Sequence, residues 1–228
     1  MQRKKYSLED YNKSEPFNDS CIKIFIIYEG TDREPNYFEA FNVAFIEEKK
    51  AYIHHLLETE SSVKGNMPKN LLQRAKDFLD NPPENLKFTP SKTDRFRFVL
   101  DVDKHPLNQI TDLKNYSDSL IDSKLFISNF CFEIWLWFHL DLKENITSTK
   151  SKEIKTELGS KQNEFKFNFP HSYISSEYIL KAIERAEKAD VNKDDYFPAE
   201  KSTKVYLLIK ELLKYSIFNN NVEDAKIL

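Results

Sequence analysis

The segment Ile22–Tyr28 (IKIFIIY) is apolar at nearly every position, which predicts a strand that is buried on both faces. Such a strand belongs to a sheet covered on both sides, typically a parallel sheet with helices on each face. A second segment, Arg95–Leu100 (RFRFVL), alternates and then becomes fully apolar before Asp101. The two segments together favour an α/β architecture.

Helical periodicity separates these two strands. Apolar residues recur at helical spacing after Pro35, and Pro35 near the first turn suits a helix start. The expected order begins β-α-β-α-β, which predicts a parallel sheet with right-handed crossovers. The other expected elements are a strand at Tyr52–Leu57, helices at Met67–Leu79 and Leu107–Asp122, a strand at Lys124–Ile127 and a helix at Phe130–Leu140.

The character of the chain changes after Asp141. The segment Lys143–Asn168 is charged and polar with few large apolar residues, which predicts a loop and a marginal helix. Two amphipathic helices are expected beyond it, at Ser175–Lys188 and Thr203–Phe218. We therefore expect a mobile N-terminal arm over residues 1–20, an α/β core over 21–141 and a helical C-terminal part over 142–228 packed on that core.

Composition excludes several kinds of nucleotide site. The chain of 228 residues has three glycines, Gly30, Gly65 and Gly159, and no two are close in the sequence. A phosphate-binding loop needs clustered glycines so that backbone N–H groups can approach the ligand, so the P-loop, the dinucleotide fingerprint and the nucleophile elbow are absent. The formal net charge of −3 gives no overall positive field, so a nucleic-acid surface must be local or assisted by metal cations.

Several features predict a cytoplasmic protein. The stretch Met1–Ser20 is polar and is not a signal peptide. The most apolar stretch, Leu125–Leu140, contains polar residues and is shorter than the ~20 residues that a membrane span needs. Two cysteines cannot form a four-cysteine zinc site. Because Cys131 lies in an apolar run, we expect a buried free thiol and a reducing compartment.

Carboxylates follow two of the expected strands. Glu29 comes directly after Ile22–Tyr28, and Asp101 and Asp103 follow Arg95–Leu100 as a D-x-D pair. Ligands bind at the carboxyl ends of the strands in an open α/β sheet, and hard oxygen ligands suit Mg²⁺ or Mn²⁺. Each carboxylate is also explained as an ordinary turn residue, so a metal site is one of two interpretations.

Three motifs resemble those of the RloB-like family. The first is Glu29–Phe38 (EGTDREPNYF), against a family pattern of approximately EGxxTEpxYF, and the second is Ser128–Leu136 (SNFCFEIWL), against approximately SNPCFExWL. The third, Ser202–Leu208 (STKVYLL), resembles a family element in which a threonine precedes an apolar helix. The resemblance runs from about Ile22 to Leu213. It implies a Toprim-like (Rossmann-like) parallel sheet flanked by helices, with a C-terminal helical extension.

The resemblance also implies roles for the carboxylates. Glu29 corresponds to the Toprim glutamate, a general acid/base or metal ligand, and Asp101 and Asp103 correspond to the metal-binding pair. The chain departs from the family pattern at Arg33, where threonine is usual, and at Phe130, where proline is usual.

Glu133 is a further catalytic candidate. It is the only formally charged residue in the apolar stretch Leu125–Leu140, where an unpaired carboxylate is costly, so it needs a partner. It is either another carboxylate of the metal site or a structural hydrogen-bond anchor. We expect Asn129 to cap the helix from Phe130, and Glu34 to satisfy N–H groups in the first turn of its own helix rather than to bind a ligand.

Three basic residues beside the carboxylates are candidate substrate-binding residues. Arg33 could hold a substrate phosphate, because a guanidinium group suits phosphates, or it could pair with Asp32. Lys104 could stabilise a leaving oxygen, or it could lie exposed on a turn. His105 could contact a phosphate or a metal ion.

By the resemblance we expect a Toprim-type nuclease, a phosphodiesterase dependent on Mg²⁺ or Mn²⁺ that cuts DNA or RNA. Glu29, Asp101 and Asp103 would bind the metal. RloB-like proteins occur in bacterial anti-phage and abortive-infection systems, often with an ATPase of the ABC or AAA-like class. The resemblance therefore implies a defence effector with an RloA-like ATPase partner, no membrane partner, and a homo-oligomeric state that stays open.

The alternative is a catalytically silent Toprim-like module that binds its ATPase through the C-terminal helices. The apolar stripe of the last helix could form the docking face, although packing on the sheet is the competing use of the same stripe. The stripe consists of Val205, Leu208, Ile209, Leu212 and Leu213.

Overall fold

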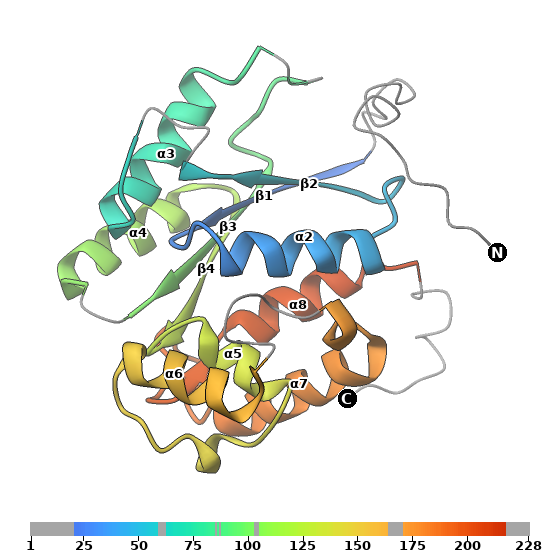
Figure 1. Ribbon diagram of the computed structural model, residues 1–228. Coiled ribbons are helices and arrows are strands. Elements are labelled where there is room, and N and C mark those ends of the chain that lie inside the picture. The colour runs from blue at the N-terminus through green and yellow to red at the C-terminus, as the bar shows by residue number, and fades with distance from the viewer. Residues whose placement is uncertain are drawn as a thin grey trace.

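A computed structural model describes residues 21–58, 63–84, 86, 88–102, 105–163 and 171–217. Within them lies a five-stranded sheet in the order β2-β1-β3-β4-β5, with helices on both faces (Figure 1). The strands are β1 (Ile22–Tyr28), β2 (Ala51–Leu56), β3 (Arg95–Asp101), β4 (Asp122–Asn129) and β5 (Ser202–Thr203). The helices are α2 (Arg33–Phe45), α3 (Pro68–Asp80), α4 (Leu107–Ser119), α5 (Glu133–Phe138), η2 (Lys143–Asn145), α6 (Ser151–Lys161), η4 (His171–Tyr173), α7 (Ser176–Ala189) and α8 (Val205–Leu213). The expected α/β, Rossmann-like architecture is confirmed.

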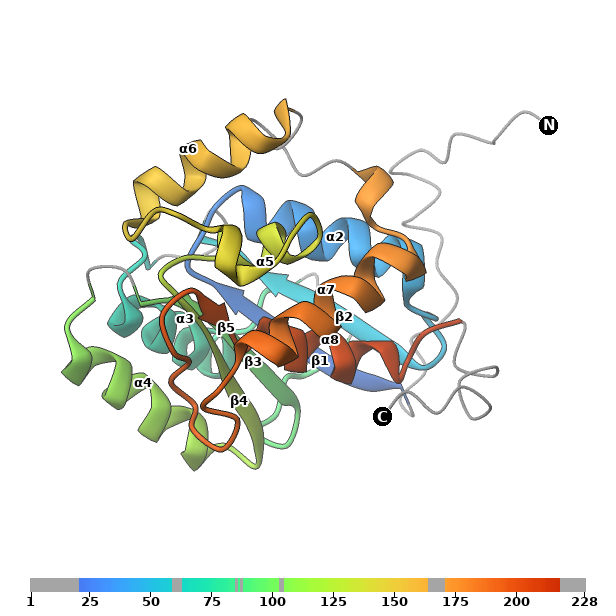
Figure 2. The same cartoon turned by 90° about the horizontal axis from the view of Figure 1, so that it is seen from below.

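Strand β1 has an apolar layer on each side, as its sequence predicts. Strands β1 to β4 are parallel, and β5 is antiparallel to β4. On one face of β1, Phe25 and Ile27 pack with α3 and α4; on the other, Ile24 and Ile26 pack with α2, α5, α7 and α8. Figure 2 shows α7 and α8 lying across this second face. Because all four side chains are fully buried, the strand has no solvent face that would favour polar residues.

The boundary between α4 and β4 differs from the sequence prediction. The helix expected to continue to Asp122 ends at Ser119. Asp122 is instead the first residue of β4, where it pairs with Arg95 of β3. The local sequence is compatible with a helix at this point, but pairing with β3, a strand distant in sequence, makes Asp122 part of the sheet.

The start of α5 also differs from the prediction. The helix expected from Phe130 begins at Glu133, because β4 continues to Asn129. Asn129 does not cap this helix: its side-chain amide donates a hydrogen bond to the carbonyl oxygen of Pro198 at 3.1 Å. The side chain expected to begin a helix therefore ties the end of a strand to a distant loop.

The C-terminal part contributes both helices and a strand. Helix α6 lies in the segment predicted as loop and marginal helix, and it is anchored by the fully buried side chains of Ile154 and Leu158. Strand β5, which the sequence did not predict, pairs with the end of β4. The last helix is shorter than expected and ends at Leu213, while Phe218 and the expected N-terminal arm lie outside the described residues.

The apolar stretch Leu125–Leu140 lies in the core, as predicted. Its two tryptophans, Trp135 and Trp137, are among the largest fully buried side chains. Among the residues that the structure describes, no helix is long and apolar enough to cross a membrane.

Candidate functional site

Four carboxylates gather where strands β1 and β3 end and helices α2 and α5 begin. Glu29 follows β1, Asp101 is the last residue of β3, Glu34 lies in the first turn of α2, and Glu133 is the first residue of α5. Their negative charges act on one another, because those of Glu34, Glu29 and Glu133 all raise the pKa of Asp101. We call these four residues the carboxylate cluster.

Glu29 is held between β3 and the loop that follows it. Its Oε2 accepts a hydrogen bond from the backbone N–H of Asp101 at 3.0 Å, and its Oε1 lies 2.8 Å from Nε2 of His105. The structure thus brings together three residues that the sequence analysis selected. The hydrogen bond from Asp101 orients one oxygen of Glu29 at the carboxyl edge of the sheet, where an α/β fold binds its ligands.

Burial and mutual repulsion make the cluster costly to ionise. The pKa of Asp101 is raised well above its usual range, first by burial and then by the charges of Glu34 and Glu29. Burial and the neighbouring charge of Glu133 raise the pKa of Glu34 to about 7. Carboxylates arranged in this way gain stability from a cation, because a cation offsets both the lost hydration and the repulsion.

Gly30 allows the Glu34 carboxylate to approach the backbone after β1. A Cβ atom added at Gly30 would lie 1.9 Å from Oε2 of Glu34. Any side chain at this position would therefore displace the Glu34 carboxylate. Glu34, which was expected to satisfy N–H groups in the first turn of its own helix, accepts a hydrogen bond from its own backbone N–H, and it is also buried in the carboxylate cluster.

Glu133 has the cationic partners that its buried position requires. Nη1 of Arg33 lies 2.8 Å from Oε1 of Glu133, and Nζ of Lys155 lies 3.7 Å from Oε2. The expectation of a partner for Glu133 is confirmed, and the first partner is the arginine that departs from the family pattern. Only 3% of the Glu133 side chain is exposed, so this charge is balanced within the protein.

Lys155 was missed by the sequence analysis. Burial by itself would lower its pKa, but the charges of Glu133 and Asp101 outweigh that effect and raise it. The residue lies in the polar segment whose sequence suggested only a loop and a marginal helix. No local signal identifies it, because its relation to the site depends on how α6 packs.

Cys131 lies beside the carboxylate cluster as a protonated thiol. Burial raises its pKa well above the usual value, and the charges of Glu133 and Asp101 raise it further. Both cysteines are free and buried, which confirms the expectation for Cys131. A thiol that resists ionisation is a poor nucleophile and a poor metal ligand, so the oxygen groups carry the chemistry of this site.

The third motif lies beside the second. The hydroxyl groups of Ser128 in β4 and Thr203 in β5 are 2.9 Å apart, and both side chains are buried. Lys204 then forms a buried ion pair with Asp190 at 2.7 Å. The contact between Ser128 and Thr203 attaches the C-terminal part to the strand that leads to Glu133, and the pair of Lys204 and Asp190 holds the C-terminal part together.

The predicted D-x-D pair is described only in part. Asp103 and Lys104 lie outside the described residues, so the roles predicted for them stay predictions. Within the residues that are described, no three histidine, cysteine, aspartate or glutamate side chains form a group that could hold a metal ion. The cluster nevertheless has the oxygen donors and the excess negative charge that suit Mg²⁺ or Mn²⁺.

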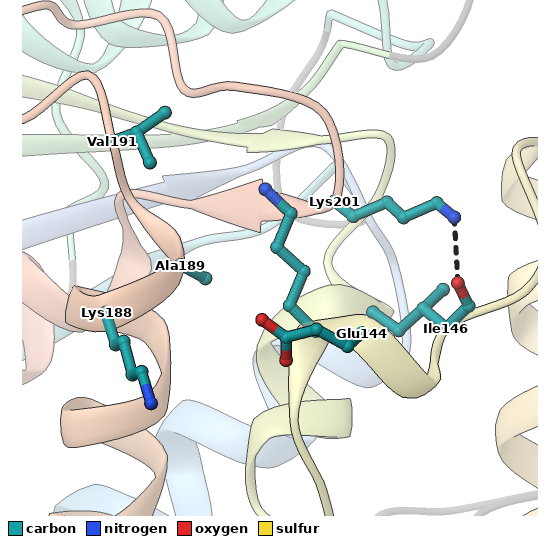
Figure 3. A pocket seen from close by; sticks show the side chains of 7 residues that line it. Glu144, Ile146, Lys188, Ala189, Val191 and Lys201 are labelled. Carbon is teal, nitrogen blue, oxygen red and sulfur yellow. Dashed lines mark hydrogen bonds between the residues drawn. The ribbon is translucent and has the colours of Figure 1, made fainter.

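A separate pocket of about 320 Å³ lies between η2, the end of α7 and the residue before β5. Its lining includes Lys143, Lys188 and Lys201, together with apolar side chains. The ammonium group of Lys201 donates to the carbonyl oxygen of Ile146 at 2.8 Å, and the ammonium groups of Lys188 and Lys201 point in different directions (Figure 3). Because these cations do not converge and no predicted site residue lines the pocket, the carboxylate cluster is the better candidate.

Comparison with known families gives one match. The model of the family described as RloB-like protein matches residues 24–212, which include all four carboxylates of the cluster and Lys155. No curated protein and no solved structure matches the sequence.

Proposed function

The chain belongs to the RloB-like family, and on that premise we propose that it is a metal-dependent phosphodiesterase of the Toprim type that cuts DNA or RNA. The observation that carries the proposal is the carboxylate cluster at the carboxyl edge of a parallel sheet. Glu29 and Asp101, which the family resemblance selects as functional residues, are in direct hydrogen-bond contact there. A purely structural cluster would be expected to balance its charges.

The donor set fits a divalent cation. Glu29 and Asp101 would hold it, together with Asp103. Burial, and then the charges of Glu34 and Glu29, raise the pKa of Asp101, and a bound cation would offset both effects. Such a cation supplies Lewis-acid polarisation of a phosphate and stabilises charge on the leaving oxygen. Glu133 already faces Arg33 and Lys155, so we assign it an anchoring role for these cations rather than a place among the ligands.

The protein's own residues bind and orient the substrate in this proposal. The guanidinium group of Arg33 is 20% exposed and lies beside the cluster, where it can contact a phosphate oxygen while Glu133 holds it in place. His105 lies next to Glu29, with its Nε2 2.8 Å from Oε1 of the carboxylate. Lys104 stays a candidate for contact with the leaving oxygen.

The family premise extends the proposal to biology. We propose that the protein is a cytoplasmic effector of a bacterial anti-phage or abortive-infection system, controlled by an ATPase of the ABC or AAA-like class. The absence of a P-loop in the sequence is compatible with an ATPase supplied by a separate chain.

A cleavage assay tests the proposed activity. Labelled single-stranded and duplex DNA and RNA would be incubated with Mg²⁺ or Mn²⁺ and the purified protein. Glu29→Gln and Asp101→Asn are expected to lower the cleavage rate on the order of a hundredfold or more, as removal of a catalytic electrostatic group does. Asp118→Asn, an exposed carboxylate of α4, is the matched control and should cleave at the wild-type rate. Equal cleavage by all variants, or no cleavage by the wild type with either metal, contradicts the proposal.

A second candidate function is a catalytically silent module that binds its ATPase. It is favoured by one observation, that no ready-made group of three metal ligands exists among the described residues. Most of the stripe proposed for docking is already buried in the core. Its side chains at four positions are at most 1% exposed: Val205, Leu208, Ile209 and Leu212. If this candidate is correct, neither Glu29→Gln nor Asp101→Asn changes biological activity, and the wild type binds no metal.

A further inference from the structure

Helix α6 places one lysine beside the carboxylate cluster. The buried side chains of Ile154 and Leu158 fix α6 against the core, and α6 packs on α5, which carries Glu133. Figure 2 shows α6 on the outside of this assembly. Lys155 follows Ile154 in the sequence, and its ammonium group lies 3.7 Å from Oε2 of Glu133. A helix that lies outside the sheet, between β4 and β5 in the sequence, thus supplies a cation to the site.

The contact between Lys155 and Glu133 leaves hydrogen-bonding capacity unused on both sides. Oε2 of Glu133 is buried, and no nitrogen or hydroxyl donor of the described residues forms a hydrogen bond with it, although the Cys131 thiol is hydrogen-bonded to the Glu133 carboxylate. The distance of 3.7 Å is too long for a hydrogen bond, so the ammonium group is held by charge alone. Its side chain is 46% exposed, compared with 20% for Arg33. Lys155 therefore has both the freedom and the exposure to contact a molecule that enters from solvent.

The charges of the cluster explain why a substrate would need such a residue. Four carboxylates repel an approaching phosphodiester, and Arg33 and Lys155 are the cations that face Glu133 within the described residues. We propose that the ammonium group of Lys155 moves away from Glu133 and contacts a backbone phosphate of the nucleic acid at this site. This inference rests on the proposed function only in taking a nucleic acid as the ligand. The role of α6 is then to carry a substrate-binding cation.

The test measures binding rather than cleavage. Fluorescein-labelled oligonucleotides, single-stranded and duplex, DNA and RNA, would be titrated by fluorescence anisotropy with Ca²⁺ in place of Mg²⁺. Lys155→Met is expected to weaken binding about tenfold, as the loss of one charge-assisted hydrogen bond does. The slope of log affinity against log salt should become less steep by about one. Lys155→Arg should keep most of the affinity, whereas a merely structural ion pair would leave affinity and salt dependence unchanged.

Lys152 of the same helix provides the control, because it is exposed and its side chain makes no ion pair with a described residue. Lys152→Met should bind as the wild type does. If Lys155→Met does not fold, acetylation footprinting of the wild type replaces it, and the oligonucleotide should protect Lys155 but not Lys152. The inference is overturned if the wild type binds none of the oligonucleotides, if Lys155→Met binds as tightly as the wild type, or if the footprint at Lys155 is unchanged.

These outcomes separate the inference from the proposed activity. Loss of binding in Lys155→Met, together with a wild type that never cleaves, supports the role of Lys155 and contradicts the nuclease. Normal binding in Lys155→Met, together with metal-dependent cleavage by the wild type, supports the nuclease and contradicts the role of Lys155.

Discussion

The two ends of the same parallel sheet carry charged clusters of opposite character. At the carboxyl end, the four residues of the carboxylate cluster face two cations among the described residues, Arg33 and Lys155. At the amino end lies a second group, which we call the arginine cluster, in which three cations face two carboxylates. The arginine cluster consists of Arg95, Arg97, Lys124, Asp122 and Glu211.

The arginine cluster satisfies its buried charges almost completely. Arg97 is fully buried in β3, and its guanidinium group donates to the carboxylates of Glu211 and Asp122 and to the carbonyl oxygens of Phe96 and Asp122. Burial alone would raise the pKa of Asp122, but the hydrogen bond and charge of Arg97 lower it. The cluster thereby stabilises the ionised form of Asp122.

The difference lies in how each cluster treats its carboxylates. Pairing lowers the pKa of Asp122 in the arginine cluster, whereas burial and repulsion raise the pKa of Asp101 and Glu34 in the carboxylate cluster. The first cluster is complete within the protein and supports the fold. The second keeps an excess of negative charge, at a cost in stability that is typical of a site built for a ligand.

The largest expected effect comes from removing Arg97 from the arginine cluster. Arg97→Met should lower the free energy of unfolding by about 3 kcal/mol, at the low end for a broken buried pair, because the largely buried Glu211 loses its closest cation while Arg95 and Lys124 still face the two carboxylates. Urea denaturation measures the loss. Adding Glu211→Gln to this variant should recover part of the lost stability, because the buried carboxylate that lost its closest cation is then neutral. A loss below about 1 kcal/mol would mean that the arginine cluster does not support the fold.

Removing a charge from the carboxylate cluster is expected to raise the stability of the protein rather than lower it. In the metal-free protein the pKa of Glu34 is about 7, above the usual 4.5, so between these pH values the native state holds a proton that the unfolded chain has lost. The free energy of unfolding therefore falls as the pH rises through this window. Glu34→Gln should remove the part of this pH dependence that Glu34 contributes and raise the stability at pH 8 by about 2 kcal/mol, while the raised pKa of Asp101 keeps the remainder.

Urea denaturation at pH 5 and pH 8 in the presence of a chelator checks the prediction for Glu34. Glu184→Gln, an exposed carboxylate of α7, is the control and should change stability little at either pH. A Glu34→Gln protein that is less stable than the wild type at pH 8 would show that the two clusters do not differ in the way described.

The smallest expected effect concerns the space beside Glu34. Gly30→Ala places a Cβ 1.9 Å from Oε2 of Glu34, so the carboxylate must move within a buried site. We expect a loss of about 1 kcal/mol, at the low end for overpacking, because the atom displaced is the end of a flexible side chain. In a Glu34→Ala background the same substitution should cost less, and equal costs in the two backgrounds would contradict the crowding.

The sequence predicts those features that depend on local pattern. The apolar run of β1 specifies a strand covered on both faces, and its bounds, Ile22–Tyr28, agree with the structure. The contact between Glu29 and Asp101 follows from parallel strands that end at one edge. The burial of Glu133 among apolar residues predicts that it has a partner.

The features that could not be predicted depend on contacts between distant segments. Arg33 and Glu133 are 100 residues apart, and nothing in either motif identifies the other as its partner. Lys155 lies in a polar segment where lysines are common and usually solvent-exposed. Asn129 has the ordinary signature of a helix cap, but it forms a contact with Pro198 that only the folded chain can make.

The central claim is that the carboxylate cluster binds a divalent cation, and calorimetric titration tests it most directly. The protein would be freed of metal with a chelator, dialysed and titrated with Mn²⁺ at pH 7.5. We predict saturable binding by the wild type, strongly weakened binding by Asp101→Asn, and unchanged binding by Asp118→Asn. Absence of saturable binding by the wild type, or equal binding by the wild type and Asp101→Asn, would contradict the account.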